Sequence, residues 1–369
     1  MRKINNIFIT GTMRTGGSLL CNLLNMHKEI FIIADKLHFF RHIYGDYRNF
    51  SQRILFRIVG ELSIRLKYRF KIFIPKLKMF NFLLKQSVKS VGQLYSSIII
   101  FFSIKIRRKI VGEYANCEWR NIENFLNFNE RNIAIQVIRD PRGVISSWKK
   151  ITFSRGVKYL NAIFNWIDAV DHALRYKKKY PKRFKIIRFE DIHNNPEKIS
   201  KQLCKFIGVN FDNDMVNEKK WNILNKLKLN VINISSYKKN EKVIGFSKTR
   251  IDNWKNNLYD WEICLIDFLC NKRMKKLKYK TSSANKYKNL SKALAILKKD
   301  TILRLRYNLF MKKNIGTDKR ILNPKDPKTW EFASISGKRF SNTLIYKRYL
   351  KELMQNNKRS LLYEHRSYR

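Results

Sequence analysis

The chain has 369 residues, 44% of them hydrophobic, so it is long enough to form one large α/β domain with an appendage or two modest domains. Lysine and arginine number 78 against 28 aspartates and glutamates, and the formal net charge of +50 favours anionic partners such as phosphate esters, nucleic acid or acidic lipid headgroups. The charge alone does not choose among these partners, because an AT-rich genome would also encode many of the lysines by drift. The five cysteines include no C-x-x-C pair, which argues against a disulfide framework and a zinc ribbon.

The start of the chain leads directly into an apolar segment. Ile7 to Thr10 is predicted to be a short buried strand, and it leaves no room for a signal peptide or a membrane anchor before it. The longest apolar run elsewhere, around Ile98 to Phe102, is well short of the roughly 20 residues that a membrane-spanning helix needs. We therefore expect a cytoplasmic protein that is soluble or peripherally bound to a membrane.

A glycine-rich loop follows this strand. It reads GTMRTGGS from Gly11 to Ser18, and the apolar spacing from Ser18 to Leu24 is typical of a helix. A strand, a glycine loop and a helix in this order allow the N-terminus of the helix to bind an anion. A loop that binds nucleoside triphosphates carries a lysine after its second glycine, but Gly17 stands there. The loop therefore predicts an anion site and leaves the kind of anion open.

Two further strand and helix units are expected downstream. Ile133 to Ile138 predicts a buried strand followed by a helix, and residues 157–176 keep helical spacing. A third strand is expected from Phe184 to Phe189, before a helix that starts at Asn195-Pro196 and stops at Gly208. Strands alternating with helices predict a P-loop-like, doubly wound parallel sheet flanked by helices.

Two basic regions do not fit this core so simply. Leu62 to Ile74 alternates apolar and basic residues, which predicts a strand with one basic face, and Lys76 to Val91 has helical spacing. We expect an α/β domain over residues 1–280, in which residues 45–112 are a basic insertion and a candidate acceptor-binding region. Residues 281–369 are expected to form a basic, mostly helical C-terminal extension, which contains no recognisable chemical motif.

The side chains around the glycine loop suit a tetrahedral anion. Arg14 supplies a cation, and Thr15 and Ser18 supply hydroxyls beside the backbone N–H groups. The second predicted strand is followed by Arg139, with Ser147 eight residues later, which predicts a second anion site. A nucleoside triphosphatase would instead need a carboxylate that holds a metal ion at such a strand end.

These motifs resemble those of the sulfotransferases that use 3′-phosphoadenosine 5′-phosphosulfate (PAPS). In that superfamily the loop after the first strand reads [RK]-[ST]-G-T-[TS] and binds the 5′-phosphosulfate, and R-T-G-G-S at residues 14–18 stands in its place. A second family motif, R-[DN]-P followed by five residues and a serine, binds the 3′-phosphate. It is matched by R-D-P-R-G-V-I-S-S at residues 139–147.

Two more segments extend the resemblance. The family segment [YF]-E-D-[LI], followed by N-P-E and a helix that ends in F-[LI]-G, is similar to residues 189–208. The segment from Arg250 to Trp254 resembles the basic, tryptophan-containing segment that closes over the nucleotide. The four motifs stand in the family order, and the resemblance covers about residues 4–280. It implies transfer of the sulfuryl group of PAPS to the hydroxyl of an acceptor, with no metal ion required.

The resemblance also implies roles for individual residues. Arg14 would neutralise the charge that grows on the bridging oxygen as adenosine 3′,5′-bisphosphate leaves. The cofactor-binding residues that the resemblance implies are Arg14, Thr15, Gly16, Gly17, Ser18, Arg139, Ser147, Phe189 and Arg250.

An acceptor hydroxyl needs a general base. Asp35 stands eight residues after His27, where some tyrosine-directed members carry a glutamate. Residues 35–40, D-K-L-H-F-F, resemble K-E-V-H-F-F of carbohydrate-directed members, with Lys36 in place of their glutamate. Asp35 is therefore the predicted catalytic base, and His38 is the alternative. The competing interpretation is that Asp35 only pairs with Lys36 or caps a helix.

The sequence departs from the family pattern at three places. Gly17 removes a hydroxyl that the family usually offers to the phosphosulfate, and Phe189 lacks the tyrosine hydroxyl that is often directed at the adenine. Both changes are expected to weaken cofactor binding without abolishing it. A mid-chain K-[DT]-P segment of some members appears here as residues 112–115 without its lysine, which leaves the handling of the acceptor open.

The expected acceptor is a carbohydrate or a lipid-linked hydroxyl, with peripheral contact to an anionic membrane. Nucleic acid is not an expected partner of such an enzyme. Two other functions stay open at this point: a degenerate P-loop kinase or nucleoside triphosphatase, and a non-catalytic basic protein that binds membranes or nucleic acid.

Overall fold

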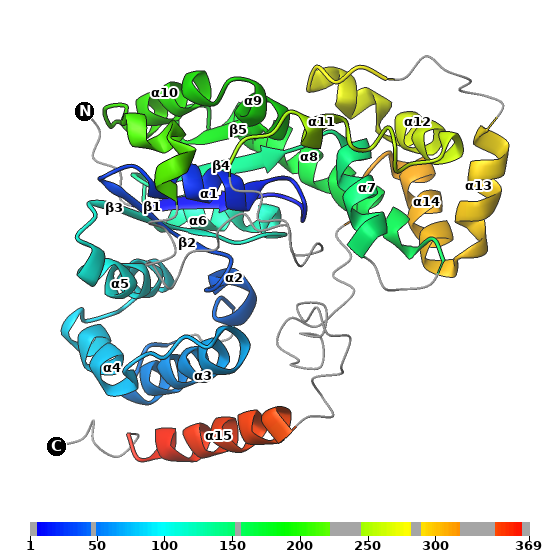
Figure 1. Ribbon diagram of the computed structural model, residues 1–369. Helices are drawn as coiled ribbons and strands as arrows, with labels where there is room; N and C mark the ends of the chain where they lie inside the picture. Colours follow the sequence, from blue (N-terminus) through cyan, green and yellow to red (C-terminus); the bar gives the residue numbers. More distant parts are fainter. Residues whose placement is uncertain are drawn as a thin grey trace.

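The computed structural model describes residues 6–45, 49–151, 156–221, 245–281, 289–317 and 344–363. Its centre is a sheet of five parallel strands in the order β2-β3-β1-β4-β5, with helices packed around it (Figure 1). The strands are β1 (Asn6–Thr10), β2 (Ile30–Ala34), β3 (Ile110–Tyr114), β4 (Ile133–Ile138) and β5 (Phe184–Arg188). The predicted doubly wound α/β class is therefore confirmed.

The two faces of the sheet are covered by different helices. Ile7, Ile9 and Ile135 belong to a core that includes α1 (Gly17–Asn25) and α10 (Pro196–Ile207). Phe8 and Ala134 point to the opposite face and belong to a core that includes residues of three other helices. These are α5 (Val91–Ser103), α6 (Ile122–Phe128) and α8 (Asn161–Lys179). Strands buried on both faces explain why their sequences are continuous apolar runs.

The chain reverses its direction of winding between β1 and β4. From β1 it leads through α1 to β2 on one side of the sheet, and from β4 it leads through α7 (Pro141–Ile151) and α8 to β5 on the other side. Ligands of open parallel sheets bind outside the carboxyl ends of the strands at such a switch point. The glycine loop and Arg139 both lie there, because each directly follows one of these two strands.

The three predicted strands are present, with small differences at their ends. Phe189 does not end β5 but begins the short helix α9 (Phe189–Asn194). Gly208 ends α10 with a φ of 81°, as the helix stop predicted, although the Asn195 side chain makes no capping hydrogen bond. The strands β2 and β3 were not predicted from the sequence.

The predicted basic strand from Leu62 to Ile74 is wrong. Its larger part lies in the helix α3 (Gln52–Phe70). Leu62 and Leu66 are buried in the main core, whereas Ile64 and Tyr68 pack against the C-terminal helix α15 (Leu344–Leu361). Two faces of this helix are buried, so apolar residues occur at every second position. This alternation is the same as that of a half-buried strand.

The remaining elements fill the surroundings of this core. The predicted helix from Lys76 to Val91 is divided into α4 (Lys76–Lys85) and the start of α5. The other elements are α2 (Phe39–His42), η1 (Ile104–Ile106), η2 (Trp119–Asn121), η3 (Lys158–Leu160), η4 (Asn213–Val216), α11 (Thr249–Asp252) and α12 (Asp260–Lys276).

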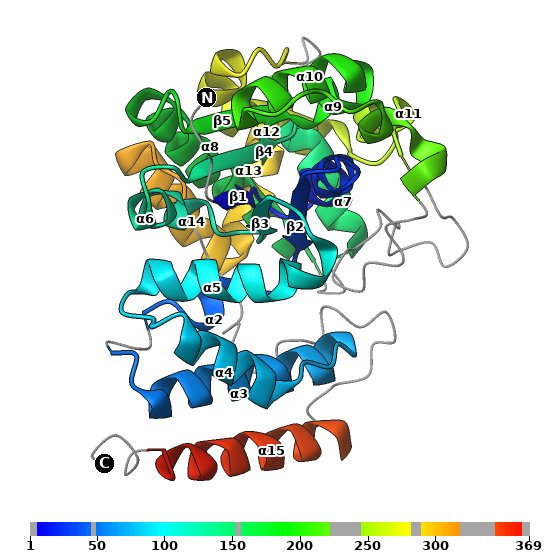
Figure 2. The same ribbon diagram turned by 90° about the vertical axis from the view of Figure 1, so that its left-hand side faces the viewer.

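Three helices follow residue 280 among the described residues. The helices α13 (Leu290–Lys299) and α14 (Thr301–Lys313) pack together beside α12, and their buried residues join the same core as α8. The helix α15 lies along α3 at one end of the molecule (Figure 2). The proposed boundary between residues 280 and 281 stays a prediction. No helix in the described ranges is long and apolar enough to cross a membrane.

Candidate active site

The loop after β1 is tightly folded. A Cβ atom at Gly16 would overlap the ring of Phe189, and Gly16 has a φ of 91°, which only glycine adopts readily. Arg14 also lies in the left-handed region, with a φ of 72°. The Thr15 hydroxyl donates to Thr12 O at 2.7 Å and holds the loop to itself. A strained backbone at a non-glycine residue persists only where the surrounding structure holds it, and such residues are concentrated at functional sites.

The first turn of α1 faces the carboxyl ends of the strands. The helix begins at Gly17 directly after the loop, with Ser18 in its first turn. The first N–H groups of a helix have no partner within the helix, and the helix dipole adds partial positive charge at the same end. This turn therefore offers hydrogen-bond donors to an anion.

Cationic side chains from three distant segments meet beside this turn. Arg14 Nε donates to Ser147 Oγ at 2.8 Å, so the loop reaches across to α7. Arg139 donates to Arg14 O at 3.2 Å and to Arg250 O at 2.6 Å, and thereby joins the end of β4 to both other segments. We call Arg14, Arg139, Ser147, Arg250 and the first turn of α1 the anion cradle.

Phe189 and Trp166 fix the position of Arg139. The Arg139 guanidinium lies 4.2 Å from the centre of the Phe189 ring, which is a cation–π contact. The indole N–H of Trp166 donates to Arg139 O at 2.8 Å. Phe189 is buried and also lies against Gly16, so it forms a wall under the loop.

The electrostatics of the anion cradle favour a bound anion. Burial lowers the pKa of Arg139 to about 10, and the charge of Arg14 acts in the same direction against the attraction of Glu190. Burial and the charge of Arg14 also lower the pKa of Arg250. These guanidiniums remain charged at neutral pH, so their mutual repulsion would be relieved by an anion between them.

His193 is a neighbour of the anion cradle that the sequence analysis missed. Its Nδ1 accepts from Ser247 N at 2.8 Å, and its Nε2 is buried without a hydrogen-bond partner among the described residues. Burial, followed by the charges of Arg250 and Arg139, lowers the pKa of His193 to about 4. The ring is therefore neutral, with Nε2 carrying the proton because Nδ1 accepts. Its place in the helix after β5 carries no motif that would single it out.

The predicted base lies at the end of the neighbouring strand β2. Asp35 accepts from the Asn116 side-chain amide at 2.7 and 2.8 Å, and its Oδ1 is 3.1 Å from His38 Nε2. Asp35 and His38 both have positive φ angles, of 53° and 47°. The Asp35 side chain is 32% exposed and the His38 side chain only 2%, so Asp35 is the more accessible group. The structure thus brings the two candidates for the general base together.

The protonation of this pair follows from its contacts. Burial would raise the pKa of Asp35, but the charge and hydrogen bond of His38, the charge of Arg41 and the Asn116 backbone hold it well below its usual value. Burial lowers the pKa of His38 to about 4 against the attraction of Asp35. At neutral pH the pair is therefore an ionised carboxylate that accepts from the Nε2–H of a neutral imidazole.

Tyr114 connects the anion cradle with Asp35. Its backbone O accepts from Asp35 N at 2.7 Å, and its ring fills the space beside Gly17. A Cβ atom at Gly17 would overlap this ring and would lie 2.6 Å from the Tyr114 hydroxyl oxygen. A tyrosine hydroxyl thus stands where a side chain at position 17 would begin, and only the folded structure reveals it.

The parallel sheet, the glycine loop at its switch point and the anion cradle define an α/β fold with cations and hydrogen-bond donors gathered at its strand ends. Residues 125–278 match the family model of the sulfotransferase domain. This range contains Arg139, Ser147, Phe189 and Arg250, whereas the glycine loop and Asp35 precede it.

Solved structures share this fold. They include the sulfotransferase domain of the Synechococcus PCC 7002 olefin synthase and the sulfotransferase domain from the curacin biosynthetic pathway. They are 17% and 18% identical, with TM-scores of 0.53 and 0.50, and the alignments cover 75% and 76% of this chain and 95% and 100% of theirs. No protein of curated function matches the sequence. Residues 125–278 are thus similar to the sulfotransferase domain, and the chain shares the fold of these solved sulfotransferase domains.

Proposed function

We propose that this sulfotransferase transfers the sulfuryl group of PAPS to a hydroxyl of a glycan or glycolipid. The observation that carries the proposal is the contact network of Arg14, Ser147, Arg139 and Arg250 at the switch point of the sheet. Its charges and hydrogen-bond donors fit a ligand with separate phosphate and phosphosulfate groups. PAPS supplies the sulfuryl group and the leaving group of this reaction.

The residues of the anion cradle divide between the two ends of such a ligand. Arg14, Ser18 and the first turn of α1 are proposed to hold the 5′-phosphosulfate, with Arg14 stabilising the charge that grows as the sulfur–oxygen bond breaks. Arg139 and Ser147 are proposed to hold the 3′-phosphate. Thr15, Gly16 and Gly17 shape the loop, while Phe189 and Arg250 support Arg139.

Asp35 is proposed as the general base, with His38 as its positioning residue. The carboxylate is ionised and partly exposed, so it can accept the proton of an acceptor hydroxyl. His38 is almost fully buried and donates to the carboxylate, which orients it.

The surroundings of Asp35 are suited to a sugar acceptor. Lys36 Nζ lies 4.2 Å from the centre of the Phe70 ring, and the Arg69 guanidinium lies 5.1 Å from the same ring. Both cations lie over this ring, so their positive charge would attract a sugar that carries acidic substituents. These residues lie within the predicted acceptor-binding region of residues 45–112 or next to Asp35.

A kinase or nucleoside triphosphatase is the less supported alternative. A lysine at position 17 would have to occupy the space that the Tyr114 ring fills. The structure therefore favours the sulfotransferase chemistry of the family.

The proposal is tested by binding and transfer assays with the full chain. Titration calorimetry measures the affinity for adenosine 3′,5′-bisphosphate, and radiolabelled PAPS with a panel of glycans and glycolipids measures transfer. Arg139→Ala is expected to weaken bisphosphate binding by about tenfold to a hundredfold, because one charge-assisted contact is lost. Arg304→Ala on the exposed face of α14 removes the same charge far from the strand ends and serves as the matched control. Absence of bisphosphate binding by the unmodified chain at micromolar concentration would refute the proposal.

We also propose that the outer face of α15 contacts an anionic membrane surface. Lys347, Lys351 and Lys358 share one exposed helical stripe with Leu350, Met354 and Leu361. Basic and apolar side chains on one helix face bind to the headgroup region of anionic bilayers. Such a contact would bring the enzyme to lipid-linked acceptors.

A further inference from the structure

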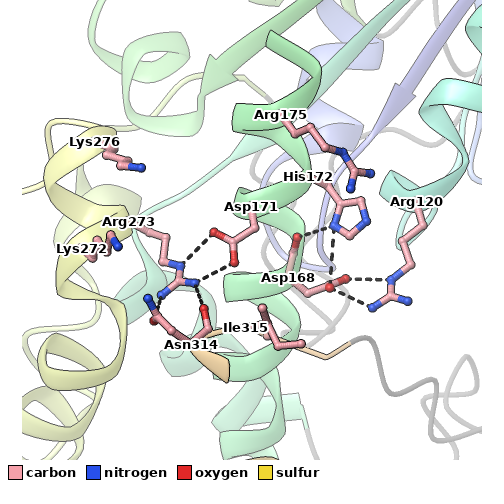
Figure 3. Close-up of a pocket in the computed structure, with 11 residues that line it drawn as sticks. Arg120, Asp168, Asp171, His172, Arg175, Lys272, Arg273, Lys276, Asn314 and Ile315 are labelled. Atoms are coloured by element: carbon pink, nitrogen blue, oxygen red, sulfur yellow. Dashed lines mark hydrogen bonds and ion pairs between the residues drawn. The ribbon is translucent and has the colours of Figure 1, made fainter. Parts of the chain in front are cut away.

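A second basic pocket lies away from the anion cradle. It has a volume of about 580 Å³ and lies between α8, α12, η2 and the segment after α14 (Figure 3). Its charged lining consists of five cations and two carboxylates. These are Arg120, Arg175, Lys272, Arg273, Lys276, Asp168 and Asp171, and none of them belongs to the anion cradle.

Both carboxylates of the pocket are already neutralised. Asp168 accepts two hydrogen bonds from Arg120, at 2.9 and 2.8 Å, and a third from the Trp119 indole at 2.7 Å. Asp171 accepts two hydrogen bonds from Arg273, at 2.9 and 2.7 Å. These planar pairs hold the arginines rigidly and cancel the negative charge of the pocket. The positive charge that remains comes from the rim.

The rim carries cations on opposite sides. Lys272 and Lys276 rise from α12 on one side, and Arg175 stands on α8 on the other side (Figure 3). Lys272, Lys276 and Arg175 are exposed, and neither lysine makes an ion pair with a described carboxylate. Cations that face one hollow from two helices concentrate positive potential inside it.

The third wall of the pocket is fixed firmly. Asn314 O and Oδ1 accept from Arg273 at 2.5 and 2.8 Å. Gly316 packs so closely on α8 that a Cβ atom there would overlap the backbone of Phe164 and Asp168. The pocket is therefore a preformed part of the fold, which lowers the entropic cost of binding a ligand.

We infer that this pocket binds a small oligoanion whose phosphate or sulfate groups contact Lys272 and Lys276 on one side and Arg175 on the other. Its volume lies within the usual range for small-ligand sites. Seven of the eleven lining residues are charged and five of these are cations, so the recognised feature is anionic charge. Two sources share this chemistry: a free phosphorylated metabolite and a sulfated or phosphorylated glycan. The inference does not depend on the proposed function, because no residue of the pocket takes part in sulfuryl transfer.

Lysine acetylation followed by mass spectrometry tests the site directly. The full chain is acetylated briefly with and without pyrophosphate, and the rate is measured at each lysine. Pyrophosphate at low millimolar concentration is expected to slow acetylation of Lys272 and Lys276 by about fivefold. Lys177, Lys178 and Lys292 are exposed lysines on α8 and α13 outside the pocket, and they should not be protected. Because each rate is local, an anion in the anion cradle does not affect the result.

A variant tests whether the ligand bridges both sides. Arg175→Ala is expected to remove most of the protection, and Arg304→Ala should leave it unchanged. Adenosine 3′,5′-bisphosphate and a sulfated disaccharide, used in parallel, distinguish the two sources by the lower protecting concentration. Equal slowing at all five lysines, or no slowing with any of the three probes, would overturn the inference, since only non-specific attraction would remain. Unchanged protection in Arg175→Ala would overturn the bridging geometry.

Discussion

At the scale of single residues, the absence of a side chain at Gly17 makes room for the ring of Tyr114. The tyrosine ring occupies the space that a side chain at position 17 would need, and its hydroxyl stands where that side chain would begin. Burial keeps the Tyr114 pKa well above its usual value, so the hydroxyl remains a hydrogen-bond donor. The hydroxyl that the family places at this point of the loop is therefore proposed to come from β3.

Removing the Tyr114 hydroxyl tests whether it replaces the hydroxyl that is missing at position 17. Tyr114→Phe is expected to weaken PAPS binding by about threefold to tenfold, the effect of one net hydrogen bond. Tyr95→Phe is the matched control, because Tyr95 is also buried and its hydroxyl has no partner among the described residues. Titration with a PAPS analogue measures both affinities. Equal affinities of Tyr114→Phe and the unmodified chain would show that the hydroxyl makes no contact with the ligand.

The role of Asp35 as the general base is tested by replacing it with asparagine. Asp35→Asn is expected to reduce kcat by about a hundredfold to ten-thousandfold while the affinity for adenosine 3′,5′-bisphosphate changes little, because only proton transfer is lost. The depressed pKa of Asp35 keeps the carboxylate ionised in mild acid, so kcat of the unmodified enzyme should not show a carboxylate limb between pH 7 and 5. Loss of bisphosphate affinity in Asp35→Asn would instead indicate a structural role.

The sequence predicted those contacts of the candidate site that depend on spacing along the chain. Arg139 and Ser147 belong to one motif and are eight residues apart, and Arg14 stands in the loop that precedes the first helix. Their contacts follow because the loop and the motif come directly after neighbouring parallel strands. Tyr114 and His193 could not be identified in this way. Their relation to the site depends on distances between β3, α9 and the glycine loop, and no local pattern records such distances.

At the scale of elements, α3 is held between the main core and α15. Gly60 allows this close packing, because a Cβ atom there would overlap the side chain of Asn356. Asn356 Oδ1 accepts from Lys76 Nζ at 2.5 Å, and its Nδ2 donates to Arg57 O at 3.3 Å. The contact therefore ties α15 to both α3 and α4.

A double-mutant cycle measures this contact. Gly60→Ala is expected to lower the free energy of unfolding by about 1–3 kcal/mol, although alanine is the better helix former, because overpacking outweighs propensity. Asn356→Ala in the Gly60→Ala chain should restore part of the loss by making room. Urea unfolding of the four chains gives the coupling. Purely additive effects would mean that α15 does not lie against Gly60.

Glu113 in the middle of β3 gives the sheet a pH dependence. Its side chain is fully buried, and burial raises its pKa to about 8 against the hydrogen bond from Phe39 N. A carboxyl with a raised folded-state pKa stabilises the fold below its unfolded value, near 4.5, and this stability is lost as the pH rises to about 8.

The amide variant separates this effect from other titrations. Glu113→Gln does not titrate, so its free energy of unfolding relative to the unmodified chain should rise by a few kcal/mol between pH 5 and pH 8.5. The buried histidines titrate equally in both chains and cancel in the difference. A difference that stays constant with pH would mean that Glu113 is ionised in the folded protein.

The elements that the sequence did not predict have physical reasons. The strand β3 contains Gly112 and Glu113, which are poor strand formers, but Gly112 lets β1 approach closely and Glu113 is neutral when buried. The α3 error arose because alternation matches a helix that is covered on two faces. The glycine loop, by contrast, allowed β1 and α1 to be predicted, because glycines indicate a loop from the local sequence alone.

At the scale of the whole molecule, the excess positive charge is divided among separate regions. Cations gather at the anion cradle, in the second basic pocket, and at the end of the molecule where α3 and α15 pack together. Each of these two helices contains five basic residues and one acidic residue, and the acidic residue is paired in both cases. The pairs are Arg57–Glu61 at 2.9 Å and Lys67–Glu352 at 2.6 Å. The five cations of α15 are exposed, so they can face a large anionic surface.

Vesicle binding tests the proposed contact of this end with a membrane. The full chain should sediment with vesicles that contain phosphatidylserine and not with neutral vesicles, and binding should weaken steeply with salt, because each cation near an anionic bilayer contributes about 1 kcal/mol. Met354 is 63% exposed on the apolar stripe of α15, so Met354→Asp is expected to weaken binding by about tenfold through loss of apolar insertion and added charge repulsion. Gln355→Asp adds the same charge at the neighbouring exposed position beside the stripe, and it should weaken binding less. If both variants weakened binding equally, net charge alone would drive the association, and α15 would have no preferred face toward the membrane.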